Sequence, residues 1–206
     1  MENFHGIFTA LLTPFAADGR INDRALAWLI ERSIRAGVTG FYACGSTAEV
    51  FTLSHDERRM LMRLSAELNS GRATMIAHVG AISTDESVAL AKEAAALGYD
   101  GYDEMFLSGF AAGADGGIAS TYNFMAEKYV RIRECFLAGK MGEARAVQHE
   151  CNEIIRVLVK LGVMAGEKAI LNLLGGDFGG CRKPFADCDA AGYALFEREV
   201  MGHLMA

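Results

Sequence analysis

The 206-residue chain has little of what marks membrane, secreted and nucleic-acid-binding proteins. No apolar run approaches the ~20 residues of a membrane-spanning helix. Residues Met1–His5 show no basic segment followed by an apolar stretch, so no signal peptide is visible. Acidic residues outnumber basic ones by 26 to 20, which leaves no excess of cations for nucleic-acid phosphates. We therefore expect neither a membrane nor a nucleic acid among the partners.

The chain also lacks the cysteine spacing of a metal-binding or disulfide-rich protein. Its five cysteines form no close pairs, and an odd number of scattered cysteines is typical of reduced thiols in a cytoplasmic protein. Zinc sites usually space their cysteines by roughly two to four residues, whereas Cys181 and Cys188 stand further apart without a histidine pair. We therefore expect a cytoplasmic protein with no metal and no cofactor.

Proline is scarce, with 2 residues, while glycine is common, with 23, and hydrophobic residues make up 51% of the chain. This composition is typical of a globular protein with many short turns. The length predicts one domain, or one domain with a small appendage.

Strand-like and helix-like segments alternate in the first half of the chain. Gly6–Thr13 is a nearly continuous apolar run stopped by Pro14, which is typical of a strand buried on both faces. Asn22 can cap the helix that follows, and Ser54 begins a capping box. Repeated strand–helix units predict a parallel sheet or a barrel. The strands are expected at 6–13, 39–44 and 74–79, and the helices at 23–36, 54–69 and 83–97.

The alternation breaks down at residues 98–103, which read Gly-Tyr-Asp twice in succession. A fourth strand is due there, but an apparent helix at 104–112 follows at once, and a short strand is expected within 113–121. The rest of the chain is expected to be helical, at 123–137, 142–161, 166–174 and 189–205.

Several motifs, in order along the chain, resemble one known family. They are Gly6–Phe15, Gly45–Glu49, Ile76–Gly80, Gly101–Glu104, Gly113–Asn123 and Arg182–Phe185. On these residues the chain resembles the N-acetylneuraminate lyase and dihydrodipicolinate synthase family of pyruvate-dependent class I aldolases. The Gly-Tyr-Asp-Glu and Ser-Thr-Tyr-Asn stretches point to the sialic acid lyase branch, which converts sialic acid to N-acetylmannosamine and pyruvate.

The resemblance implies an eight-stranded (β/α) barrel followed by C-terminal helices, which typically needs ~250 residues. In the family, one Gly-Tyr-Asp-like triplet opens the fourth strand and another ends the seventh, whereas here the two are joined. We therefore expect a large internal deletion. The fold class expected is α/β, a TIM-barrel-derived (β/α) barrel reduced to about five βα units plus C-terminal helices, with the truncated barrel at 1–137 and the helical extension at 138–206. Either the five units close into a small barrel, which we favour, or a homo-oligomer covers the open strand edges.

The segment expected to be missing carries the family's chemistry. The resemblance implies a lysine on the sixth strand that forms a Schiff base with the keto acid, and a tyrosine on the fifth strand that relays protons. The six lysines of this chain fall on expected helices, on helix edges or in the loop around Arg182, and none ends a strand. We therefore expect no catalytic residue for that step.

Ser46 and Thr47 follow the second expected strand. The resemblance implies that their hydroxyl and amide groups bind the carboxylate of pyruvate. The alternative is an ordinary turn at a strand end, with local hydroxyl capping. Ala48 stands where the family usually has glycine.

Four more residues match positions that contact the polyhydroxylated tail of sialic acid: Gly101, Asp103, Glu104 and Ser120. Carboxylates suit this role because they accept hydrogen bonds from several hydroxyls. The alternative is that Asp103 and Glu104 form an ordinary acidic helix start.

Other polar residues have plainer interpretations. Tyr42 is expected in the core or on a pocket wall, and His78 in the core. Glu49 is expected to hydrogen-bond its loop, and Arg182 to be solvated or to bind an anion.

Three functions remain open: a lyase-family enzyme with residual or altered activity, a non-catalytic protein that binds a small keto acid or sialic acid or serves as a structural subunit, and a deletion product without chemistry.

Overall fold

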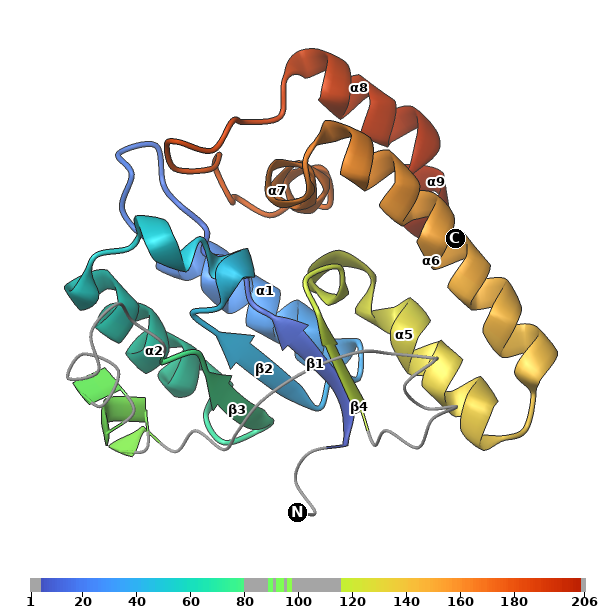
Figure 1. Cartoon of the computed structure of the whole chain (residues 1–206), viewed down its shortest axis with the longest axis horizontal. Coiled ribbons are helices and arrows are strands. Elements are labelled where there is room, and N and C mark those ends of the chain that lie inside the picture. The colour runs from blue at the N-terminus through green and yellow to red at the C-terminus, as the bar shows by residue number, and fades with distance from the viewer. Residues whose placement is uncertain (1–4, 80–88, 91, 95, 98–115, 205–206) are drawn as a thin grey trace.

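The computed structural model describes residues 5–79, 89–90, 92–94, 96–97 and 116–204. Within these ranges it contains one parallel sheet with the strand order β3-β2-β1-β4 (Figure 1). The strands are β1 (Gly6–Ala10), β2 (Gly40–Ala43), β3 (Thr74–Ala77) and β4 (Gly116–Ala119). The first strand of the chain is thus central and lies beside the last, and the α/β class expected from the sequence is confirmed.

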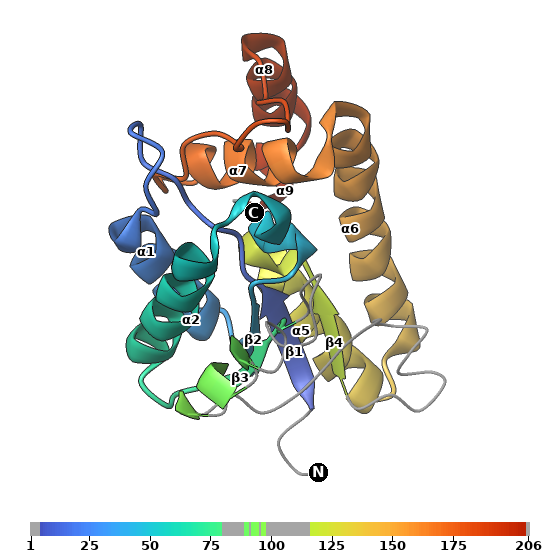
Figure 2. The same cartoon turned by 60° about the vertical axis from the view of Figure 1, so that its left-hand side comes forward.

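Helices cover one face of the sheet and one of its ends. Helix α1 packs between α2 and α5, and α6 packs along α5. Helix α7 contacts α5, α6 and α8. In Figures 1 and 2, α7 lies above the carboxyl ends of the strands. The helices are α1 (Asp23–Arg35), α2 (His55–Asn69), α5 (Tyr122–Leu137), α6 (Met141–Leu161), α7 (Val163–Leu173), α8 (Ala190–Glu199) and α9 (Met201–Leu204).

The helix starts follow from local capping. The Asn22 side chain accepts a hydrogen bond from the Ala25 amide, so that α1 begins at the next residue. Before α2, Ser54 and Glu57 satisfy each other's backbone amides in the expected capping box. Both starts are confirmed, because each depends only on residues within one turn.

The two faces of the sheet bury different apolar residues. Ile7, Phe41 and Met75 face the helices, where the main core lies. Phe8 and Ile76 lie on the other face, in a smaller cluster that Tyr42 packs against. This alternation explains the continuous apolar run of the first strand, because both of its faces are buried.

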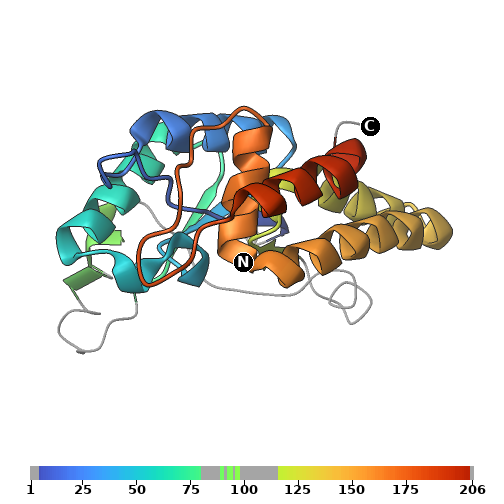
Figure 3. The same ribbon diagram turned by 90° about the horizontal axis from the view of Figure 1, so that it is seen from above.

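The C-terminal helices differ from expectation in their bounds: the helix expected at 189–205 is divided into α8 and α9, and the one expected at 166–174 begins earlier. One helix was expected to begin at Gly166, but Gly166 lies inside α7, which begins at Val163 directly after Gly162, with φ of 94°. A side chain at Gly166 would meet Leu158 and Phe196 within 3 Å, so α7 packs closely here because this residue has none. In the view from above, α7 crosses between the α1 side and the α6 side (Figure 3).

Two expected elements fall outside the described residues. These are the short fourth strand at 98–103 and the helix at 104–112. In the part that is described, β3 and β4 end the row of strands and do not pair with each other. None of the described helices is long and apolar enough to cross a membrane.

Candidate functional site

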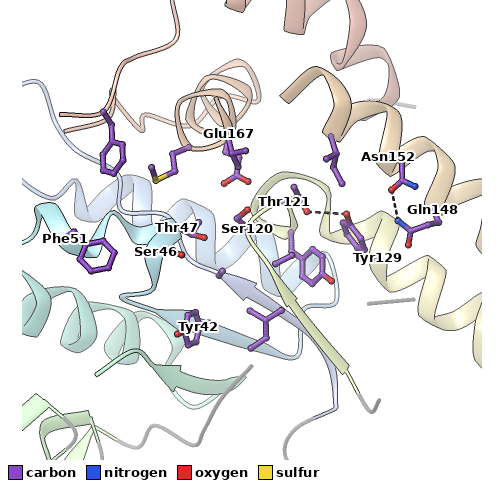
Figure 4. A pocket seen from close by; sticks show the side chains of 18 residues that line it. Tyr42, Ser46, Thr47, Phe51, Ser120, Thr121, Tyr129, Gln148, Asn152 and Glu167 are labelled. Carbon is purple, nitrogen blue, oxygen red and sulfur yellow. Dashed lines mark hydrogen bonds between the residues drawn. The ribbon is translucent and has the colours of Figure 1, made fainter. Parts of the chain in front are cut away.

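A cavity of about 1000 Å³ lies between the carboxyl ends of the strands and α7 (Figure 4). Hydroxyl and amide side chains and apolar residues line it from β1, β2, β4 and three helices. The lining residues are Ala10, Tyr42, Ser46, Thr47, Phe51, Ile118, Ala119, Ser120, Thr121, Tyr122, Tyr129, Gln148, Asn152, Ile155, Val163, Met164, Glu167 and Phe185.

Ser46 and Thr47 form the wall that follows β2. They lie in a short 3₁₀ turn, Ser46–Ala48. Ser46 is exposed and Thr47 is half-buried. Gly45 precedes the turn because a side chain there would meet the Tyr42 ring at 2.4 Å. The hydroxyl of Thr13 donates to the Ala48 carbonyl at 2.8 Å and ties the turn to the segment after β1.

Ala48 fits this turn without backbone strain. It is helical and buried, and the left-handed conformations lie on either side of the turn, at Cys44 and Glu49. The methyl group therefore needs no glycine-like backbone.

Ser120 enters the cavity from the end of β4. Its position is set by Asn123, whose amide nitrogen donates to the carbonyls of Ser120 and Ala10 at 2.6 Å each. One buried side chain thus joins the ends of β1 and β4. The sequence identified Asn123 only as part of a motif and did not indicate this role.

Of the six predicted binding residues, the structure brings together Ser46, Thr47 and Ser120. Gly101, Asp103 and Glu104 lie outside the described residues. Tyr42 is half-buried on the cavity wall, as expected. Its ring also lies edge-on to that of His78.

The cavity is closed above by α7, and a buried ion pair fixes this helix. The Lys168 Nζ lies 2.5 Å from the Glu49 Oε1, and both side chains are excluded from solvent. Lys168 also donates to the Gly180 carbonyl at 2.9 Å and lies over the Phe15 ring. Glu49 was expected to bond its own loop, and the structure instead connects it to a distant helix.

None of the six lysines, all of which are described, lines the cavity. Lys168 alone is fully buried, and its ammonium group is held by Glu49. The side chain therefore faces away from the space between Thr47 and Ser120.

Glu167, the neighbour of Lys168, lines the cavity and was not singled out from the sequence. Its side chain is completely buried, and burial raises its pKa to about 8, an effect that Ser120 partly offsets. In Figure 4 its carboxyl group points from α7 toward Ser120. No described residue makes a hydrogen bond of good geometry to either carboxyl oxygen.

The loop around Arg182 holds the fold together beside this site. The backbone amide of Arg182 donates to Glu49 at 2.8 Å, and its guanidinium bonds Glu57 and the carbonyl of Thr52. Hydrogen bonding from Arg182 lowers the pKa of Glu57 to about 2. From the sequence, Arg182 was expected to be solvated or to bind an anion. The structure shows it in an ion pair with Glu57 of the same chain.

On the opposite wall, neutral groups pair with one another. The hydroxyls of Thr121 and Tyr129 are 3.2 Å apart, and the Gln148 amide donates to Asn152 at 3.0 Å. Among the described residues, no group of three histidine, cysteine, aspartate or glutamate side chains is placed to hold a metal ion.

The sequence profile of the dihydrodipicolinate synthetase family matches residues 3–102 and 99–201 of this chain. The N-acetylneuraminate lyase of Rhizobium meliloti (strain 1021) is 31% identical over 286 aligned positions, which cover 98% of this chain and 95% of the relative.

Solved structures agree on the fold. The N-acetylneuraminate lyase of Fusobacterium nucleatum, solved in complex with pyruvate, superposes with a TM-score of 0.87 at 24% identity, over 95% of this chain and 97% of that chain. A catalytic lysine mutant of the Ruminococcus gnavus sialic acid aldolase gives a TM-score of 0.89 at 22% identity, over 96% and 94%. The TIM-barrel-derived fold expected from the sequence is thereby confirmed.

Proposed function

The chain belongs to the dihydrodipicolinate synthetase family, and from this we propose that it is an N-acetylneuraminate lyase-like protein that binds a keto acid or sialic acid but has lost the covalent step. The observation that carries the proposal is a large cavity whose described lining includes Ser46, Thr47 and Ser120 but no lysine.

Ser46 and Thr47 are proposed to bind the ligand's carboxylate. Their hydroxyls line the cavity at the end of β2, and the pyruvate complex of the Fusobacterium relative supports a keto acid as the ligand. Ser120 faces the same space and is proposed to hydrogen-bond the hydroxyl-bearing part of a larger ligand. Gly101, Asp103 and Glu104 are proposed for that part as well, on the resemblance alone.

An internal deletion is proposed to have removed the catalytic strands. Two observations support it. The family profile matches the chain as two separate segments that meet at residues 99–102, within the repeated Gly-Tyr-Asp triplets. The alignment with the Rhizobium relative is 286 positions long, whereas this chain has 206 residues.

Without a free amine at the cavity, the reaction cannot begin. Schiff-base formation needs a neutral lysine to attack the keto carbon, with loss of water, and the imine then accepts the electrons of the broken C–C bond. The buried lysine nearest the site, Lys168, is paired with Glu49. We therefore propose binding without turnover, by a truncated barrel at 1–137 and a helical extension at 138–206.

Open strand edges support a homo-oligomer as the working form. In the described part of the sheet, β3 and β4 each have one strand neighbour, and unpaired strand edges favour pairing with another chain. The five cysteines are free thiols, in keeping with the cytoplasm, which we propose as its location.

Borohydride trapping with pyruvate tests the loss of chemistry. Borohydride reduces a lysine imine to a stable amine, which mass spectrometry detects as an added mass. We expect no adduct, together with a rise in Tm when pyruvate is added. This rise should disappear in Thr47→Val. An adduct on any lysine would contradict the proposal, and Lys168→Arg would then show whether Lys168 carries it.

A further inference from the structure

Glu167 and Glu49 are both buried carboxyl groups near the cavity, but only one of them has a cation. Glu49 is paired with Lys168, whereas Glu167 has no cationic partner among the described residues. A buried carboxyl group without a partner costs stability. Among the described residues only Ser120 hydrogen-bonds Glu167, and not in good geometry, so the carboxyl group keeps further hydrogen-bonding capacity at the cavity wall.

The packing of α7 holds Glu167 in this place. Lys168, the next residue, is fixed to Glu49 and to the Gly180 carbonyl. On the other side, Gly166 lets Leu158 and Phe196 approach the helix backbone. These contacts set the rotation of the helix, so the Glu167 side chain is aimed into the cavity and not toward solvent (Figure 4).

The surroundings of Glu167 in the cavity are neutral. Among the described residues that line the cavity, Glu167 alone carries a carboxyl, amine, imidazole or guanidinium group, and the other polar groups are hydroxyls and amides. Ser120 faces the carboxyl group directly. A wall of neutral donors and acceptors matches a neutral, hydroxyl-rich group better than an ammonium ion or a second carboxylate.

We propose that Glu167 determines ligand specificity by hydrogen-bonding the hydroxyl groups of a polyhydroxylated ligand beside Ser120. The inference rests on the proposed function for the place of the ligand and adds a contact from α7. The protonated carboxyl group can donate through its O–H and accept through its C=O, and a sugar hydroxyl can do both in return. Its high pKa keeps it in this form at neutral pH, so it does not repel an acidic ligand.

Calorimetric binding of three probes to the full chain near neutral pH tests the proposal. N-acetylmannosamine carries the hydroxyl groups without a carboxylate, mannosamine has an ammonium group in place of the N-acetyl group, and pyruvate has the carboxylate without hydroxyls. The variants are Glu167→Leu and Glu167→Met, which cannot form hydrogen bonds through this side chain, and Glu167→Gln, which both donates and accepts. Glu197→Leu, at an exposed position on α8, is the matched control.

We expect N-acetylmannosamine to bind about tenfold more weakly to both apolar variants, and within about twofold of the unchanged chain to Glu167→Gln and to the control. Pyruvate binding should not change in any of the four. Two apolar variants are used so that a folding defect in one does not decide the result.

Equal binding of N-acetylmannosamine to the unchanged chain and the apolar variants would overturn the proposal, as would no binding at all. A loss confined to mannosamine would also overturn it, since that result identifies a cation site. Failure of the proposed function would give a different result. That function is tested by the rise in Tm with pyruvate and its loss in Thr47→Val, whereas the role of Glu167 is tested only by the binding of N-acetylmannosamine.

Discussion

The ammonium group of Lys168 lies 2.5 Å from the carboxylate of Glu49, and the two side chains are 1% and 0% exposed. This ion pair joins the helix above the cavity to the turn that carries Ser46 and Thr47. The two residues of the pair are 168 − 49 = 119 positions apart in the sequence, so the contact joins two distant segments beside the cavity. The geometry of the site therefore depends on a bond outside the cavity.

Breaking the ion pair should destabilise the fold strongly. In Lys168→Met, the Glu49 carboxylate stays buried without its cation, and we expect the free energy of unfolding to fall by about 3–5 kcal/mol. The double variant Glu49→Met with Lys168→Met should lose less, because no unpaired charge remains. Urea unfolding measures both. Lys160→Met, at an exposed lysine, is the control. Equal losses in the single and double variants would show that packing, not charge, is the cause.

Glu167 should make the protein less stable as the pH rises. Its pKa is about 8 in the folded chain, above the ordinary value of 4.5, so the folded state holds a proton that the unfolded state has released. The contribution of Glu167 to stability is fully present below the pKa that this group has in the unfolded chain. It is lost as the pH rises through the pKa of the folded chain, at roughly 1.4 kcal/mol per pH unit at most.

Urea unfolding across this pH range should therefore show a falling stability for the unchanged chain relative to Glu167→Gln, with the difference levelling off above the folded pKa. Glu153→Gln, an acid-to-amide change on α6, serves as the control. Parallel pH curves for the unchanged chain and Glu167→Gln would mean that the carboxyl group is not buried in solution.

The ion pair of Arg182 and Glu57 should act in the opposite pH range. Arg182 holds the pKa of Glu57 at about 2, so this contribution is present above the ordinary value of 4.5 and is lost as the pH falls toward 2. Both side chains are partly exposed, at 22% and 28%, so solvent screening limits the effect to about 1–2 kcal/mol.

In Arg182→Ala, part of the acid sensitivity of unfolding between these two pH values should disappear. Arg182→Lys keeps the charge but cannot bond Glu57 through two nitrogens, and we expect it to behave in between. Thermal unfolding at a series of acidic pH values measures this. The same acid profile in all three proteins would contradict the assignment.

The sequence predicted best where short-range chemistry decides. The caps at Asn22 and Ser54 and the alternation of strands and helices from β1 to β3 follow from local patterns. Parallel strands bring their carboxyl ends to one edge, which places turn residues from distant strands in one cavity.

The role of α7 could not be predicted in the same way. Lys168 and Glu167 look like ordinary polar residues of a helix, since helical periodicity shows which residues share a face but not what that face meets. Their burial depends on the Glu49 turn and the Gly180 carbonyl, far away in sequence. A Glu-Lys pair beside a glycine that fits Leu158 and Phe196 is the one local signal of close packing, and the sequence pattern predicts only that a helix begins at this glycine.

The smaller apolar cluster, on the sheet face opposite the main core, depends on Gly40 in β2. A side chain at Gly40 would lie 2.1 Å from the Phe8 ring, which is itself 3% exposed. In Gly40→Ala the ring must move within a packed cluster, and we expect a loss of about 1–3 kcal/mol in the free energy of unfolding. Phe8→Leu with Gly40→Ala should recover part of that loss, because a smaller side chain leaves room for the methyl group.

Gly142→Ala is the control for this change. Gly142 is the second residue of α6 and has open space around it, so the same substitution there should leave stability unchanged or raise it by up to about 0.5 kcal/mol. Thermal unfolding of these three variants and the unchanged chain separates the two effects. If Gly40→Ala were as harmless as Gly142→Ala, the Phe8 ring would not pack against Gly40 of β2 in solution.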